Sequence, residues 1–158
     1  MPAVMAKPGS APDTPADEMR VWFRFVRLHQ RISLAMSARL RCIGLSVPQF
    51  DVLSTLSERE GITQSELAER LYVTKGNVSG LVDRLVDAGM VERRPIATDR
   101  RSYALHLTAH GRDLAEQGLA TQRSYVSQTL GRLEPGELAA FDRLILSWRS
   151  HVRAAAEA

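Results

Sequence analysis

Two short capped helices that follow each other closely constrain the fold of this chain more than any other feature. Thr63-Gln64-Ser65-Glu66 has the pattern of a capping box, in which the first hydroxyl and the last carboxylate bond backbone N–H groups at a helix start. Thr74 can cap the next helix, which is expected to end near Ala88-Gly89 because glycine favours helix C-termini. The helices expected at 64–72 and 75–88 are therefore joined by a tight turn, which is the spacing of a helix-turn-helix.

The second of these helices carries two glycines on the face opposite its apolar stripe. Its apolar residues recur at helical spacing and predict one buried side, made by Val78, Leu81, Val82 and Leu85. Gly76 and Gly80 lie one turn apart on the other side. Each glycine inside a helix costs about 1 kcal/mol relative to alanine, so an exposed pair indicates that a bare backbone is useful there.

A β-hairpin with a charged tip is expected after this helix. The segment VERR leads into a polar loop, PIATDRR, and then into SYALHLT, in which apolar residues alternate with Ala104 and His106. Residues 46–108 contain eight basic and nine acidic residues, so no broad basic face is expected there. The positive charge is local, because four arginines fall within nine positions and face only Asp99: Arg93, Arg94, Arg100 and Arg101.

A helix-turn-helix followed by a basic hairpin is a winged helix, and its shape suits duplex DNA. A helix fits the major groove, and an Arg-tipped hairpin can reach the narrow adjacent minor groove, whose negative potential attracts the guanidinium. The glycines would then let the helix backbone approach the duplex closely; the alternative is that they pack against a neighbouring helix. The candidate DNA-binding residues are Thr74, Lys75, Gly76, Asn77, Ser79, Gly80, Arg84, Arg94, Arg100 and Arg101.

Long helices are expected on both sides of the winged helix. Val21, Phe25, Leu28, Ile32, Ala35 and Cys42 form a heptad-like seam, which ends at Gly44. Ser46-Val47-Pro48-Gln49 then opens a further capped helix. A helix capped by Thr108 follows the hairpin, and after a break at 133–136 the last apolar stripe is Leu138, Phe141, Leu144, Ile145 and Trp148.

The predicted fold class is mainly α with a small β-hairpin wing. The apolar seams at both ends have no partner of matching length in the middle of the chain, so a homodimer is expected. Four segments follow from this organisation: a flexible leader at 1–16, an N-terminal dimerisation helix at 17–45, the winged helix-turn-helix lobe at 46–108, and C-terminal dimerisation helices at 109–158.

Several other classes of protein do not fit the sequence. The Pro-rich leader has no apolar core typical of a secretory signal and no apolar run could span a membrane, so a cytoplasmic location is expected. One cysteine, Cys42, excludes an intrachain disulfide and a thiolate zinc cluster within one chain. Catalytic motifs such as a Gly-rich phosphate loop, a nucleophile elbow or an HExxH run do not occur, so neither an enzyme nor a cofactor is expected.

Three features suggest additional chemistry, but each has a plainer interpretation. Cys42 could sense oxidants, but its place on the apolar seam predicts a buried small residue. His106 and His110 are four residues apart, but one is expected on a strand and the other in a helix, so a metal pair is disfavoured. Trp22, Phe23, Phe25 and Trp148 could line an effector pocket, but aromatic residues at helical spacing are more often core.

From GLSVPQFDVLSTL through LAERLYVTKGNVSGLVDRLVDAGMVERR to DRRSYALHLTAHGRDL, the chain resembles the MarR (multiple antibiotic resistance regulator) family of bacterial winged-helix transcription factors. The resemblance implies a homodimeric regulator, more often a repressor than an activator, with the helix from Lys75 as the recognition helix. It implies that Arg101 enters the minor groove and that Asp83 is its acidic partner, and Asp99 belongs to the same wing support. The runner-up function is a winged-helix module for protein-protein contact. A small aromatic or phenolic effector is expected where the first helix and the helix from Thr108 meet the winged lobe.

Overall fold

The computed structural model describes residues 17–97 and 99–157, with only the backbone described at 99–101. The leader expected at 1–16 lies outside these residues. Contacts divide the chain after Ala35, within helix α1 (Glu18–Arg41), into two units that are described separately below.

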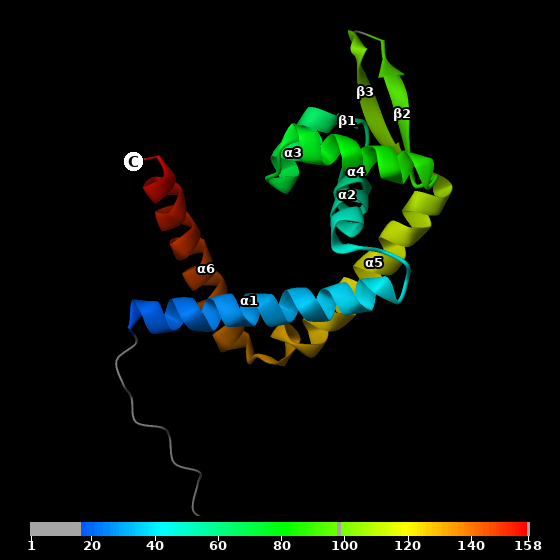
Figure 1. Ribbon diagram of the computed structural model, residues 1–158. Coiled ribbons are helices and arrows are strands. Elements are labelled where there is room, and N and C mark those ends of the chain that lie inside the picture. Colours follow the sequence, from blue (N-terminus) through cyan, green and yellow to red (C-terminus); the bar gives the residue numbers. More distant parts are fainter. Residues whose placement is uncertain (1–16, 98, 158) are drawn as a thin grey trace, which may run out of the picture. The chain divides into compact units, whose positions relative to one another are not determined.

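The element order confirms the predicted fold class, mainly helical with a small β wing (Figure 1). After α1 the helices are α2 (Val47–Glu58), α3 (Gln64–Leu71), α4 (Lys75–Asp87), α5 (Ala109–Gln128), the short 3-10 helix η1 (Leu130–Arg132) and α6 (Pro135–Ala156). The strands β1 (Ile62–Thr63), β2 (Val91–Ile96) and β3 (Asp99–Leu107) form one antiparallel sheet in the order β1-β3-β2. Figure 1 shows β2 and β3 projecting as a hairpin beside the adjacent helices α3 and α4.

The predicted caps begin the helices of the lobe. Ser46 and Thr63 each start a complete capping box, with Gln49 and Glu66 bonding back to the cap backbone at 2.9 and 2.7 Å. Thr74 Oγ1 accepts a hydrogen bond from the backbone N–H of Asn77 at 3.4 Å. Local hydrogen bonding of side chains to backbone therefore sets where these helices start.

The sheet differs from the prediction in two respects. The polar loop expected at 95–101 is wrong, because β2 continues through Pro95 to Ile96 and β3 begins at Asp99, leaving a shorter turn. The pairing shifts register between Pro95 and Ile96, where proline offers no N–H to the ladder. Strand β1 was not expected, because two residues paired to Leu105 and Ala104 are too few to give an alternating pattern.

One hydrophobic core holds the lobe together. Helix α4 contributes Val78, Val82 and Leu85, all almost completely inaccessible to solvent, while Leu81 is half-buried. These side chains meet buried residues from every neighbouring element, including Leu53 of α2, Leu67 of α3 and Leu105 of β3. The buried stripe predicted for this helix is confirmed, and it fixes which side of α4 remains outside.

The start of α5 is locked against the base of the hairpin. Thr108 Oγ1 donates a hydrogen bond to the carbonyl oxygen of Gly89 at 2.6 Å and accepts one from the N–H of Gly111 at 3.0 Å. The N–H of Thr108 also bonds the carbonyl oxygen of Met90 at 3.1 Å. Gly111 is required by this close approach, since a Cβ atom there would lie 1.8 Å from that same oxygen.

A second link joins β3 to α5 through Glu60, in the loop after α2. One oxygen of its carboxylate lies 3.2 Å from Nδ1 of His106, and the other lies 2.6 Å from a guanidinium nitrogen of Arg112. Burial would raise the pKa of Glu60, but the contacts with His106 and Arg112 outweigh it and hold the pKa below its ordinary value. His106 thus belongs to a polar cluster with Glu60 and Arg112, and no group of three potential metal ligands occurs among the residues that the structure describes.

The expectation of a buried Cys42 is wrong, as is the expectation that the aromatic residues at both ends are core. Cys42 is exposed in the turn after α1, with its thiol 3.4 Å from the carbonyl oxygen of Ala38. Trp22, Phe23, Phe25 and Trp148 retain between 39% and 54% of their accessible surface. These side chains are therefore partly accessible to solvent in the single chain. Within the described ranges, no helix is both long enough and apolar enough to cross a membrane.

Replacing Gly111 with alanine should destabilise the protein. The new Cβ atom would overlap the backbone of Met90, and overpacking of this kind costs about 3 kcal/mol. Urea unfolding should show this loss in the free energy of unfolding. The matched change Gly80→Ala, at a position where a Cβ atom would meet no described atom within 4 Å, should not lower stability. Equal stability of Gly111→Ala and wild type would contradict the close packing of α5 on Met90.

Candidate nucleic-acid interface

Helix α4 turns a bare strip of backbone to the outside, which we call the glycine face, made by Gly76 and Gly80. Both residues are exposed, on the side of the helix opposite Val78, Val82 and Leu85. A Cβ atom at either glycine would meet no described atom within 4 Å. The alternative that these glycines pack against a neighbouring helix therefore has no support in the described part of the chain.

One flank of the glycine face is tied to the hairpin. Asp83 Oδ1 lies 2.5 Å from a guanidinium nitrogen of Arg93 on β2, and this ion pair connects α4 to the wing. Ser79 precedes Asp83 by one helical turn and is exposed on the same flank. Arg93 was not among the predicted site residues. The pairing could not be read from the sequence, because it depends on how β2 lies against α4.

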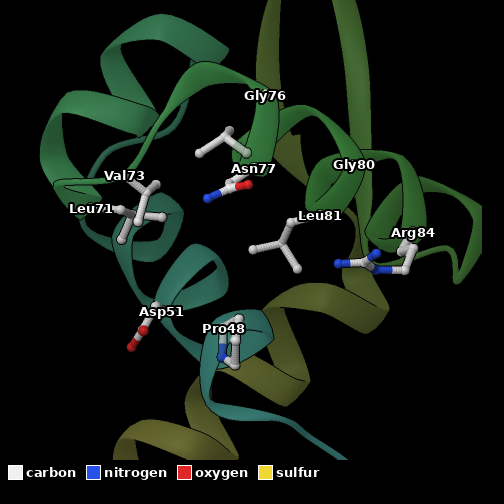
Figure 2. A pocket seen from close by; sticks show the side chains of 10 residues that line it. Pro48, Asp51, Leu71, Val73, Gly76, Asn77, Gly80, Leu81 and Arg84 are labelled. Carbon is white, nitrogen blue, oxygen red and sulfur yellow. The ribbon is translucent and has the colours of Figure 1, made fainter.

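The other flank of the glycine face borders a hollow of about 490 Å³ between α4 and the start of α2 (Figure 2). Its lining comes from α2, the end of α3, the turn before α4 and α4 itself: Pro48, Asp51, Leu71, Val73, Gly76, Asn77, Val78, Gly80, Leu81 and Arg84. Figure 2 shows Asn77, Leu81 and Arg84 along α4, facing Pro48 and Asp51 of α2. Partial desolvation beside this apolar wall raises the pKa of the Asp51 carboxyl above its ordinary value.

The structure thus brings most of the predicted DNA-binding residues together around α4. Thr74 and Lys75 are exposed at its start, Ser79 lies on the wing flank, and Asn77 and Arg84 lie on the hollow flank. Arg94 is exposed on β2, and its Nε donates a hydrogen bond to Glu92 at 2.8 Å. The side chains of Asp99, Arg100 and Arg101 lie outside the described residues, so only their place on β3 is known.

The wing flank carries an acidic residue whose charge is already paired. An isolated carboxylate beside the glycine face would repel phosphate, but the guanidinium of Arg93 lies directly on Asp83. Lys75 and Arg84 are exposed cations on the same helix. An exposed backbone strip, cationic side chains beside it and a projecting hairpin together define a winged-helix protein suited to duplex DNA.

Comparison with known proteins assigns the family. Residues 43–102 match the MarR family. A helix-turn-helix transcriptional repressor from Mycobacterium tuberculosis is 32% identical over 130 residues, which cover 82% of this chain and 94% of that protein. The chain belongs to the MarR family.

Solved structures agree with this assignment. A MarR variant from E. coli in complex with operator DNA has a TM-score of 0.72 and 26% identity, covering 82% of this chain and 94% of that one. AbsC, a MarR family transcriptional regulator from Streptomyces coelicolor, has the same fold, with a TM-score of 0.79, 24% identity and coverage of 93% and 99%. The relatives named here are transcription regulators, which agrees with the expectation that the chain is not an enzyme.

Gly80→Ala should stabilise the protein while weakening its binding to DNA. The methyl group meets nothing within the lobe, and alanine favours a helix interior by about 1 kcal/mol. On the duplex, the same methyl would hold the backbone of α4 away from the groove, and we expect about a tenfold loss of affinity, or ~1.4 kcal/mol. Urea unfolding and fluorescence anisotropy with a duplex selected from a random pool would measure the two effects.

The matched control is Gly136→Ala, an equally open glycine in α6. This change should leave DNA affinity as it is in the wild type. Full DNA affinity in Gly80→Ala would show that the glycine face does not approach the duplex.

Proposed function

We propose that this protein is a transcriptional repressor that binds an inverted-repeat DNA operator as a homodimer. The family assignment supports the DNA-binding reading over the protein-contact module, because a relative of 26% identity was solved with operator DNA. The name of the mycobacterial relative supports repression rather than activation.

One observation carries the proposal: α4 is packed so that its two glycines face outward with nothing against them. These glycines are not required for folding, since alanine would fit at both positions and would stabilise the helix. They would instead favour DNA binding, because glycine allows close approach to the duplex. Hydrogen bonds from Asn77, Ser79 and the α4 backbone require the helix to lie deep in the major groove.

The residue roles follow from the two flanks of the glycine face. Asn77 on the hollow flank is assigned to base edges, and Lys75 at the helix start is assigned to phosphate. Arg101 on β3 is assigned to the minor groove. Asp83 as the partner of Arg101 stays a prediction; Asp83 also bonds Arg93 and so attaches the root of the wing to α4.

The homodimer is supported by the apolar surface at both ends of the chain. Val21, Leu28 and Ile32 of α1 are exposed, as are Leu138, Leu144 and Ile145 of α6. Exposed apolar residues in such numbers are typical of a surface that another chain covers. A two-fold dimer would place its recognition helices on half-sites about one helical turn, or 34 Å, apart.

The effector and the cellular location remain predictions from the sequence. A small aromatic or phenolic molecule that loosens DNA binding would itself bind less tightly to the DNA-bound protein, by thermodynamic reciprocity. A cytoplasmic location accords with a regulator that must reach the chromosome.

Arg101→Ala tests the proposed function most simply. The change should lower operator affinity without unfolding the protein, because a hairpin tip contributes little to the core. If each of two arginines in the dimer displaces about one condensed counterion, the slope of log affinity against log salt should become shallower by roughly two units. Anisotropy titrations at several salt concentrations give this slope.

Asn77→Ala provides the contrasting variant. Loss of a base contact should reduce discrimination between the selected duplex and its variants by about 1–3 kcal/mol, with little change in the salt slope. Unchanged affinity and slope in Arg101→Ala would show that the wing does not read DNA, and the protein-contact function would then be preferred.

A further inference from the structure

Tyr72, in the turn between α3 and α4, is the most exposed large hydrophobic residue in the described part of the chain, with 96% of its surface accessible. Its neighbours Leu71 and Val73 both line the hollow beside α4. The flanking residues thus face the hollow, whereas the aromatic ring between them lies in solvent. Such an arrangement gives no stability to the lobe, because the ring buries almost nothing.

The backbone conformation of Tyr72 is also unfavourable for a tyrosine, so folding stability does not account for this residue. Its φ of 54° and ψ of 39° place it in the left-handed region, and it is the only non-glycine residue with positive φ in the described ranges. The other described residues with positive φ, Gly44, Gly61 and Gly89, are all glycines. Glycine adopts this conformation without steric strain, whereas a tyrosine is disfavoured there.

The conformation itself is required by the turn. The N–H of Tyr72 bonds the end of α3, at the carbonyl oxygens of Ala68 and Glu69, and the N–H of Val73 bonds Ala68 at 3.1 Å. These bonds end α3 and let Thr74 cap α4 directly afterwards. The turn thus needs a left-handed residue at position 72, but nothing in the described fold needs that residue to be tyrosine.

We propose that the Tyr72 hydroxyl donates a hydrogen bond to a phosphate of the duplex at the edge of the major groove. The inference rests on the proposed function. In a helix-turn-helix, the start of the second helix meets base edges while the first helix crosses the backbone, so the turn between them lies beside phosphates. Tyrosine hydroxyls are among the groups that make such contacts. Lys75, exposed at the start of α4, favours an anion at the same place.

Tyr72→Phe is the direct test, because it removes only the hydroxyl. Affinity should fall roughly tenfold, as expected for a hydrogen bond to a charged group. Phosphate carries no sequence information, so the loss should be the same for a random-sequence duplex and for a duplex selected with the wild-type protein. The phenol is neutral, so the salt slope should not change.

Tyr72→Gly gives a second, independent readout. It should lose at least as much affinity as Tyr72→Phe, but its melting temperature should be equal to or higher than that of the wild type, because glycine relieves the left-handed strain. A residue that merely stabilised the turn would instead lower both quantities. The matched control is Tyr125→Phe in α5, which keeps the ring beneath the guanidinium of Arg39 and should leave DNA affinity unchanged.

The outcomes separate this inference from the proposed function. If the wild-type protein binds neither duplex, both the proposed DNA-binding function and the Tyr72 contact are overturned. If the wild type binds and Tyr72→Phe binds equally well, only the Tyr72 contact is overturned. A loss confined to the selected duplex also overturns it, because that pattern belongs to a base contact.

Discussion

The burial of one face of α4 is the constraint on which the rest of the structure depends. Val78, Val82 and Leu85 are in the centre of the core, so α4 cannot rotate about its axis without exposing them. This fixes the glycine face outward, with one flank of the helix tied to β2 and the other facing the start of α2 across the hollow. The packing of one side of α4 therefore determines which side of the helix is accessible to a partner.

Residues on the outer side of α4 and in the turn before it lower the stability of the lobe. Two glycines in α4 each cost about 1 kcal/mol relative to alanine, and a left-handed tyrosine adds a cost of similar size. These residues lie at the start and on the outer face of α4. The helix caps, the core and the hydrogen bonds of Thr108 at the start of α5 all have favourable local geometry. Such local exceptions are expected where a surface is shaped for a partner rather than for folding.

Local signals account for what the sequence could predict. Thr63, Thr74 and Thr108 act within one helical turn, so each cap could be identified from a few consecutive residues. The long-range features could not: strand β1 depends on pairing with a distant β3, and the Asp83–Arg93 ion pair spans ten positions across two elements. Cys42 and the terminal aromatic residues were wrongly placed in a core, because helical periodicity identifies an apolar face without saying which chain covers it. Tyr72 was overlooked, since left-handed geometry is visible only in the structure.

Methylation protection on a selected duplex tests the central claim most directly, because guanine N7 lies in the major groove and can be protected only by a group that enters it. The account predicts two protected segments with centres about one helical turn apart, one for each α4 of the dimer. Guanines that remain reactive throughout the bound duplex would contradict it, since α4 would then not lie in the major groove.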